Sequence, residues 1–123
     1  MVWLADDCPM IRRITKARLG VLGYPVIYFP TGSVLIAKWV TEAVERPSLV
    51  LVDQNMPGIT GIDTGVLLRT EGYAGRLVLY TADDSRVIEE EAMCCGFDAV
   101  IRKPASAEAL AEQIAQVPSN RAA

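Results

Sequence analysis

The chain has no histidine among its 123 residues. This absence excludes a histidine kinase or histidine phosphotransfer site, a catalytic triad that uses imidazole, and zinc held by histidine. The three cysteines form neither a C-x-x-C zinc pattern nor an even-numbered disulfide framework, so we interpret Cys8, Cys94 and Cys95 as small packing residues. Carboxylates, lysine and hydroxyl groups remain as the side chains available for chemistry.

Long hydrophobic runs and an excess of basic charge are also missing. Hydrophobic residues make up 51% of the chain, yet no run reaches the roughly 18 residues that span a membrane. The formal net charge is −3, whereas nucleic-acid-binding domains usually carry a basic patch. The N-terminus shows neither the basic region nor the cleavage site of a signal peptide. We therefore expect a cytoplasmic globular protein that has no direct contact with a membrane or with nucleic acid.

Five short apolar segments alternate with segments of helical pattern along the chain. No internal repeat, low-complexity segment or linker interrupts this alternation, and the length suits one domain. Strict alternation of strand and helix predicts an α/β fold with a five-stranded parallel sheet that is covered by helices on both faces. The expected strands are 2–5, 26–29, 49–53, 76–80 and 99–102.

The helices are predicted from apolar residues that recur every three or four positions. In the second helix, residues 33–45, this pattern leaves Trp39 partly exposed. The run Glu89-Glu90-Glu91 is interpreted as a solvated face and not as a metal site. The stripes expected to face the sheet are Met10, Ile14, Ala17 and Val21 in the first helix, Val34, Ala37, Val40 and Val44 in the second, Val87, Ile88, Ala92 and Cys95 in the fourth, and Leu110, Ile114 and Val117 in the last.

Polar residues indicate where three of these helices begin. Thr60 and Asp63 have the spacing of a capping box, in which each side chain bonds the backbone of the other. Asp83 or Asp84 is expected to cap the fourth helix, and Ser106 the last, because side chains of these types accept hydrogen bonds from free N–H groups of the first turn.

The stretch 49–58 carries the first candidate for a functional residue. Four apolar residues suit a strand buried on both faces, and Asp53 follows them shortly before a Met-Pro-Gly turn. Ligands of open α/β sheets bind beyond the carboxyl ends of the strands, which makes an acid at this position a site candidate. Taken alone, the stretch fits equally well an aspartate that only caps the following turn.

Polar residues follow three other strands in the same way. Asp6 and Asp7 come after the first strand, Thr81 after the fourth and Lys103 after the fifth. In a parallel sheet these ends share one edge, so we expect the four side chains to converge there with Asp53. Three neighbouring carboxylates repel one another unless a cation is present, and all-oxygen ligands suit Mg²⁺. A carboxylate is also a nucleophile that forms aspartyl phosphates, and a lysine ammonium can neutralise the transferred group.

The chain resembles a response-regulator receiver domain of two-component signalling from about residue 2 to residue 117. The resemblance rests on four motifs, which are the acid pair Asp6-Asp7, the D-x-N-M-P-G stretch that starts at Asp53, Thr81-Ala82 and Lys103-Pro104. It implies a doubly wound sheet with the flavodoxin-like strand order 2-1-3-4-5. Residues 1–117 would then form the receiver domain and residues 118–123 a frayed C-terminal tail.

The resemblance implies a phosphoacceptor with a metal site beside it. Asp53 would accept the phosphoryl group. Mg²⁺, with Mn²⁺ as a substitute, would be bound by Asp7, the Asp53 side chain and the backbone carbonyl of Asn55, while Asp6 would act mostly through a bound water. Lys103 would pair with the acceptor carboxylate and later with the phosphoryl group.

The resemblance also implies how the site is tuned and how its state is reported. Thr81 would be the switch hydroxyl, and Asn55 and Asp83 match the two variable positions that tune dephosphorylation. The peptide bond before Pro104 would be cis, as it commonly is in the family. Many receivers place a Tyr or Phe three residues before the site lysine, where this chain has Val100. The last two helices and the fifth strand are therefore expected to signal through a smaller shift.

The function implied is a signalling switch and not an enzyme, apart from self-catalysed phosphotransfer and autodephosphorylation. Asp53 would take the phosphoryl group from a phosphohistidine on a histidine kinase or histidine phosphotransfer protein. A downstream protein partner or a fused output domain would read the change, and a homodimer through the fourth helix, fifth strand and fifth helix is expected. Two alternatives stay open. One is a small aspartyl phosphatase of the haloacid dehalogenase type, which usually has an acid where this chain has Asn55, and the other is a receiver fold that serves only as an interaction module.

Overall fold

The computed structural model of the chain describes residues 1–41, 46–103 and 106–118. In these ranges five β-strands alternate with five α-helices, which confirms the predicted alternation. The elements are β1 (Val2–Ala5), α1 (Pro9–Val21), β2 (Val26–Phe29), α2 (Gly32–Thr41), β3 (Leu49–Val52), α3 (Gly61–Thr70), β4 (Arg76–Thr81), α4 (Arg86–Cys94), β5 (Ala99–Arg102) and α5 (Ala107–Gln116).

The five strands form one sheet in which every pair of neighbours is parallel. Their order is β2-β1-β3-β4-β5, so the predicted order 2-1-3-4-5 is confirmed. The register places Leu51 of the central strand β3 beside Leu4 on one side and Val78 on the other. Because all strands run in the same direction, the loops that follow them lie along one edge of the sheet.

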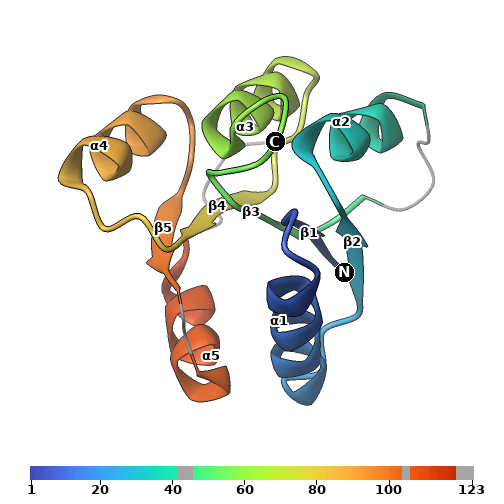
Figure 1. Cartoon of the computed structure of the whole chain (residues 1–123), viewed down its shortest axis with the longest axis vertical. Coiled ribbons are helices and arrows are strands. Elements are labelled where there is room, and N and C mark those ends of the chain that lie inside the picture. Colours follow the sequence, from blue (N-terminus) through green and yellow to red (C-terminus); the bar gives the residue numbers. More distant parts are fainter. Residues whose placement is uncertain (42–45, 104–105, 119–123) are drawn as a thin grey trace.

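Helices cover both faces of the sheet, with α1 and α5 on one face and α2, α3 and α4 on the other (Figure 1). All four residues of β3 are buried. Leu49 and Leu51 belong to the core beneath α1 and α5, whereas Val50 and Val52 belong to the core beneath the other three helices. Burial on both faces explains why this strand is a continuous apolar run.

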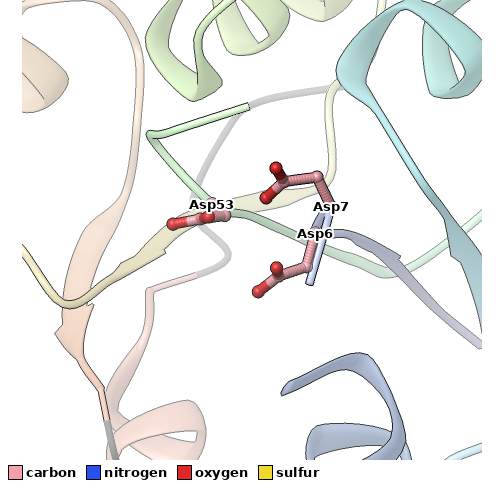
Figure 2. A group of neighbouring side chains, drawn as sticks. All are labelled: Asp6, Asp7 and Asp53. Atoms are coloured by element: carbon pink, nitrogen blue, oxygen red, sulfur yellow. The ribbon is translucent and has the colours of Figure 1, made fainter. Parts of the chain in front are cut away.

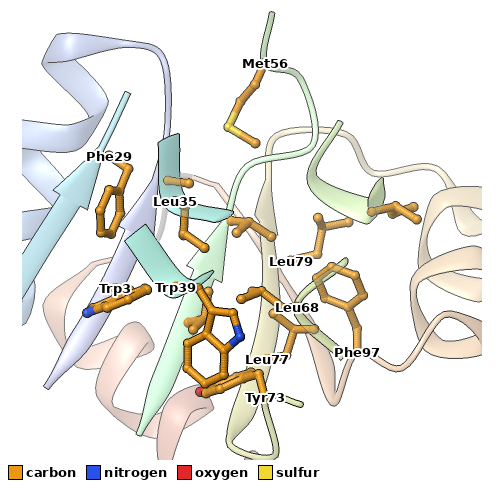
Figure 3. Packing of buried hydrophobic residues seen from close by; sticks show 14 of the residues in the cluster. Trp3, Phe29, Leu35, Trp39, Met56, Leu68, Tyr73, Leu77, Leu79 and Phe97 are labelled. Carbon is orange, nitrogen blue, oxygen red and sulfur yellow. The ribbon is translucent and has the colours of Figure 1, made fainter. Parts of the chain in front are cut away.

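Aromatic rings fill the core between the sheet and α2 (Figure 3). Trp39 of α2 packs edge-on against Trp3 and Tyr73, with ring centroids 6.2 and 5.4 Å away, and its indole N–H donates to the carbonyl of Glu71 at 3.1 Å. The expectation that Trp39 is partly exposed is therefore wrong, since only 7% of it is exposed. The indole satisfies its polar atom at the edge of the core and buries the rest of the ring.

The inner faces of α1 and α2 also differ from the predicted stripes. In α1 the buried residues are Thr15 and Leu19, while the predicted stripe Met10, Ile14, Ala17 and Val21 is exposed. In α2 the buried side chains are Leu35 and Trp39, while Val34, Ala37 and Val40 are exposed and Val44 lies outside the described residues. Both helices carry apolar residues on two sides, so the spacing of residues did not by itself select the side that meets the sheet.

The two C-terminal helices agree better with their predicted stripes. Leu110, Ile114 and Val117 are buried as expected along α5. In α4 Ala92 is buried, but Val87 is 70% exposed and Cys94 is also exposed, which contradicts the packing interpretation for that cysteine. None of the helices in the described ranges combines the length and the apolar character that crossing a bilayer requires.

The helix starts follow the predicted capping residues in α3 and α5. Thr60 and Asp63 form the capping box, and Ser106 accepts a hydrogen bond from the first turn of α5. The cap of α4 is Ser85 and not Asp83 or Asp84, because the side chain of Asp83 turns back to bond the N–H of Ser85. Three predictions lie outside the described residues. They concern the peptide bond before Pro104, the end of the second helix near Glu45, and residues 119–123 of the predicted tail.

Candidate functional site

Two strand ends bring three acidic residues together at the carboxyl edge of the sheet. Asp6 and Asp7 follow β1, and Asp53 follows β3. The backbone extends the sheet at these positions, because the N–H of Asp53 donates to the carbonyl of Ala5 at 2.9 Å and the N–H of Asp6 donates to that of Phe29 at 3.1 Å. The two loops are thereby held at fixed positions beside each other (Figure 2).

The carboxylates of Asp6, Asp7 and Asp53 form one cluster, in which one oxygen from each lies within 4.8 Å of the others. Asp6 and Asp53 are buried, with 1% and 8% exposed, whereas Asp7 is exposed. Hard cations such as Mg²⁺ take oxygen ligands from one or two carboxylates and keep several waters. The cluster fits such an ion, because Asp7 is exposed and leaves room for bound waters.

Lys103 supplies the positive charge of the site. Its ammonium group forms a direct ion pair with Oδ2 of Asp6 and lies 3.4 Å from Oδ1 of Asp53. The lysine side chain is 9% exposed, and its backbone N–H donates to the carbonyl of Thr81 at 2.8 Å. The end of β5 is thus fixed to β4, and the ammonium group reaches across to the ends of β1 and β3.

The environment of Asp53 disfavours the charged form of its carboxylate. Burial raises the pKa of Asp53 above its ordinary value of 3.8, and the negative charge of Asp6 raises this pKa further. The nearby ammonium group of Lys103 and the backbone N–H of Asn55 oppose this effect without cancelling it. A cation or a second positive group beside Asp53 is therefore favourable.

A pocket of 380 Å³ opens onto this cluster. It is lined by Asp6, Cys8, Ile11, Asp53, Asn55, Ala82 and Lys103. Thr81 is fully buried beside it, and the hydroxyl oxygen of Thr81 accepts a hydrogen bond from the N–H of Asp83 at 3.1 Å. The structure therefore brings together the carboxylates, Asn55 and Lys103, and it holds Thr81 one residue before Ala82 at the pocket wall.

The two remaining predicted positions, Asp83 and Val100, do not line this pocket. The carboxylate of Asp83 is occupied by the N–H of Ser85, at 2.8 Å. Val100 pairs with Leu79 across the sheet and packs, half-buried, against the core beneath α2, α3 and α4. Its apolar side chain has no atom that forms a hydrogen bond with the site.

Sequence reasoning missed three residues that shape the cluster. The N–H of Cys8 donates to Oδ1 of Asp6 at 2.9 Å, and the guanidinium of Arg12 donates to the carbonyl of Asp6 at 2.9 Å. A Cβ at Gly61 would lie 2.3 Å from the carbonyl oxygen of Asp53, so α3 approaches the acceptor loop where only glycine fits. The glycine at the start of α3 and the aspartate two residues before Cys8 were visible local signals, because aspartate side chains often bond the backbone two residues on. The Arg12 contact depends on how α1 is oriented.

A doubly wound parallel sheet with an acidic cluster and a lysine at its carboxyl edge defines a flavodoxin-like α/β domain with a candidate metal site. The family model of the response regulator receiver domain matches residues 2–115, and the chain belongs to this family. It is a receiver domain of two-component signalling, a regulatory family of phosphorylation-dependent switches.

Named relatives with similar sequences are mostly longer proteins. The chain is 34% identical to the transcriptional regulatory protein KdpE of Mycobacterium tuberculosis, over 100% of this chain and 53% of that protein. It is 31% identical to a nitrate/nitrite response regulator protein homolog of Haemophilus influenzae, over 94% of this chain and 55% of that protein. It is 26% identical to the sensor protein EvgS of Escherichia coli, over 94% of this chain and 9% of that protein. The chain therefore spans about half the length of the two regulators and a small part of the sensor.

Solved structures show the same fold at lower sequence identity. The chemotaxis response regulator CheY4 of Vibrio cholerae matches with a TM-score of 0.85 and 24% identity, over 95% of this chain and 97% of that chain. The response regulator TrrA of Thermotoga maritima, solved in complex with Mg²⁺-BeF, matches with a TM-score of 0.81 and 23% identity over the same shares. These likenesses show the fold alone.

Proposed function

We propose that Asp53 is the phosphoacceptor of this receiver domain and that it takes its phosphoryl group from a phosphohistidine of a partner protein. The observation that supports the proposal is the position of Asp53, whose carboxylate lies within 4.8 Å of two further acids and 3.4 Å from the ammonium group of Lys103. The pocket of 380 Å³ gives a donor access to this carboxylate.

The transfer exchanges one bond to phosphorus for another. A carboxylate oxygen of Asp53 forms a bond to phosphorus while the bond between phosphorus and the imidazole nitrogen of the partner breaks. The electron pair of that bond stays on the nitrogen, and the imidazole regains its neutral or protonated form. Lys103 offsets the negative charge that the phosphoryl oxygens bring to the site, which is the main requirement of a loose transition state.

The acids fit Mg²⁺, with Mn²⁺ as a substitute. Asp7, the Asp53 side chain and the backbone carbonyl of Asn55 would hold the ion, and Asp6, which already pairs with Lys103, would act mostly through a water. When bound, the ion supplies charge neutralisation for the phosphoryl oxygens. The structural relative TrrA was solved with Mg²⁺-BeF, which supports the same chemistry here.

Neighbouring residues would tune the site and report its state. Thr81 would turn its hydroxyl toward a phosphoryl oxygen, while Asn55 and Asp83 would tune dephosphorylation. Val100 would take the place of an aromatic residue, so that the response of α4, β5 and α5 relies on small shifts. Apart from phosphotransfer to itself and the loss of that group, the domain would have no enzymatic activity.

The setting of the domain is part of the same proposal. Residues 1–117 would act as a receiver in the cytoplasm, with a histidine kinase or histidine phosphotransfer protein as donor and no contact with nucleic acid or membrane. A downstream protein or a fused output domain would read the state, and two copies would pair through α4, β5 and α5. The named relatives support both a regulator and a sensor context, since they include transcriptional regulators and a sensor protein.

Phosphorylation with a small donor tests the proposal directly. Incubation with acetyl phosphate and Mg²⁺ should add one acid-labile phosphoryl group, detected by intact mass, and Asp53→Asn should add none. Glu90→Gln, which changes an exposed acid of α4 that does not line the pocket beside Asp53, is the control and should react like the wild type. Fast turnover of phosphomonoesters would favour the aspartyl phosphatase instead, and the absence of both phosphorylation and Mg²⁺ binding would favour the interaction module.

A further inference from the structure

Arg102, the last residue of β5, forms a fork of contacts with the connection between β4 and α4. It stands beside Thr81 in the sheet register and directly before Lys103. One terminal nitrogen of the guanidinium donates a hydrogen bond to the carbonyl of Asp83, and the other lies 3.5 Å from the carbonyl of Ser85. The second nitrogen also pairs with the carboxylate of Glu89 at 3.0 Å. The side chain of Arg102 thus contacts Asp83 and Ser85 in the connection and Glu89 in the first turn of α4.

The same connection is linked to Thr81 by a second series of hydrogen bonds. The hydroxyl oxygen of Thr81 accepts from the N–H of Asp83 at 3.1 Å, and the carboxylate of Asp83 accepts from the N–H of Ser85 at 2.8 Å. The hydroxyl of Ser85 in turn accepts from the N–H of Ile88 at 3.1 Å. Thr81 is therefore coupled, residue by residue, to the start of α4, and Arg102 closes this series from the side of β5.

We propose that Arg102 is a positioning residue that holds the connection 82–85 in its resting arrangement and so opposes phosphorylation of Asp53. The inference rests on the proposed function, because it assigns the fork a role in the switching of that site. The N–H of Asp83 donates a hydrogen bond to the Thr81 hydroxyl, so movement of this hydroxyl toward a phosphoryl group on Asp53 pulls Asp83 with it or breaks that bond. Displacement of Asp83 must then lengthen or break the bond that its carbonyl accepts from Arg102.

The geometry of arginine explains why the residue type matters. A planar guanidinium presents several donors in a fixed fork, whereas a lysine ammonium is a single point of charge on a flexible chain. A guanidinium can donate to the carbonyls of Asp83 and Ser85 at the same time, whereas a lysine ammonium does not match this arrangement. The pair with Glu89 contributes little by comparison, since 57% of that side chain is exposed and solvent screens the charges.

Three variants of the full chain separate these contributions. Arg102→Ala removes the fork and the charge, Arg102→Lys keeps the charge without the fork, and Glu89→Gln removes only the ion pair. The rate of phosphorylation by acetyl phosphate is measured for each at saturating Mg²⁺. Amide hydrogen exchange of residues 82–89 is measured without donor, together with the global unfolding midpoint.

We expect Arg102→Ala to phosphorylate roughly three- to tenfold faster than the wild type, which is the effect of losing about one hydrogen bond from the resting state. Arg102→Lys should show most of this increase, Glu89→Gln should stay within about twofold, and only the two Arg102 variants should speed exchange at 82–89. An unchanged or lower rate in Arg102→Ala overturns the proposal, as does a wild-type rate in Arg102→Lys, which would assign the effect to charge. If Arg102→Ala fails to fold, the lysine variant alone decides in the same way.

Failure of the proposed function would look different. A wild-type chain that takes up no phosphoryl group would remove the phosphoacceptor role of Asp53. The exchange of residues 82–89 without donor would still show whether Arg102 holds the connection, because that measurement involves no phosphorylation. Equal exchange in Arg102→Ala and wild type would overturn the positioning role even where Asp53 is phosphorylated normally.

Discussion

Lys103 at the end of β5 forms an ion pair with Asp6 at the end of β1, although β3 and β4 separate these strands in the sheet. The carboxylate of Asp6 is 1% exposed and the lysine side chain 9%, so water screens this pair weakly. Removing one partner of a buried pair leaves the other charge uncompensated, which is far more costly than losing an exposed pair.

Lys103→Ala should therefore lower the free energy of unfolding by about 3 kcal/mol, measured by urea denaturation without Mg²⁺. Arg13→Ala, at an exposed position of α1, is the control and should stay within about 0.5 kcal/mol of the wild type. Asp6→Asn added to Lys103→Ala should recover part of the loss, because the unpaired charge is then gone. A loss below about 1 kcal/mol in Lys103→Ala would show that the pair is better solvated than its burial indicates.

Asp53→Asn should stabilise the unphosphorylated domain at neutral pH, which a higher thermal unfolding midpoint than that of the wild type would show. The pKa of Asp53 is raised in the folded state above its ordinary value of 3.8, mainly by burial. The unfolded chain consequently releases this proton first as the pH rises, so ionisation of Asp53 costs stability above pH 3.8. The asparagine variant avoids that cost.

The pH dependence of this difference is the sharper measurement. The advantage of Asp53→Asn should be present at pH 7 and should disappear below about pH 3.8, where both states of the wild type bind the proton. Thermal unfolding of both proteins across this range tests it. If the stability advantage of Asp53→Asn grew toward acid pH, it could not come from the ionisation of Asp53.

Mg²⁺ should stabilise the wild type through the three-acid cluster. A ligand present at 100 times its dissociation constant raises the free energy of unfolding by about 2.7 kcal/mol, so titration should raise the unfolding midpoint progressively. Asp7→Asn should weaken this response strongly, because Asp7 is the exposed member of the cluster. Asp84→Asn changes an exposed acid outside the cluster and should leave the response intact. An equal response in both variants would assign the effect to general screening by salt.

The position of the site was predictable because it depends on topology more than on side-chain detail. Apolar runs of strand length predicted the parallel sheet, and parallel strands must deliver Asp6, Asp53 and Lys103 to one edge. Those three side chains do meet there. The capping box at Thr60 was also predictable, since both of its hydrogen bonds lie within four residues.

Contacts that depend on helix orientation or on long side chains were not predictable in this way. Helix α1 has apolar residues on two sides, and packing selected the side with Leu19 over the side with Ile14. The buried position of Trp39 follows from its fit against two rings that come from distant parts of the chain. The fork of Arg102 joins segments 17 to 19 residues apart, and no local spacing signals it.

Gly61→Ala should displace the loop that carries Asp53, because the added Cβ would meet the backbone of that loop. A Cβ at this position would lie 2.3 Å from the carbonyl oxygen of Asp53 and 2.8 Å from Cδ1 of Leu79, so α3 or the loop must shift. Overpacking of this kind costs about 1–3 kcal/mol, and the displaced carboxylate should be phosphorylated several-fold more slowly by acetyl phosphate. Gly20→Ala in α1 is the matched control, because no atom lies within 4 Å of its added Cβ and alanine favours the helix by about 0.5–1 kcal/mol. A stable Gly61→Ala with the wild-type rate would show that α3 can retreat without moving Asp53.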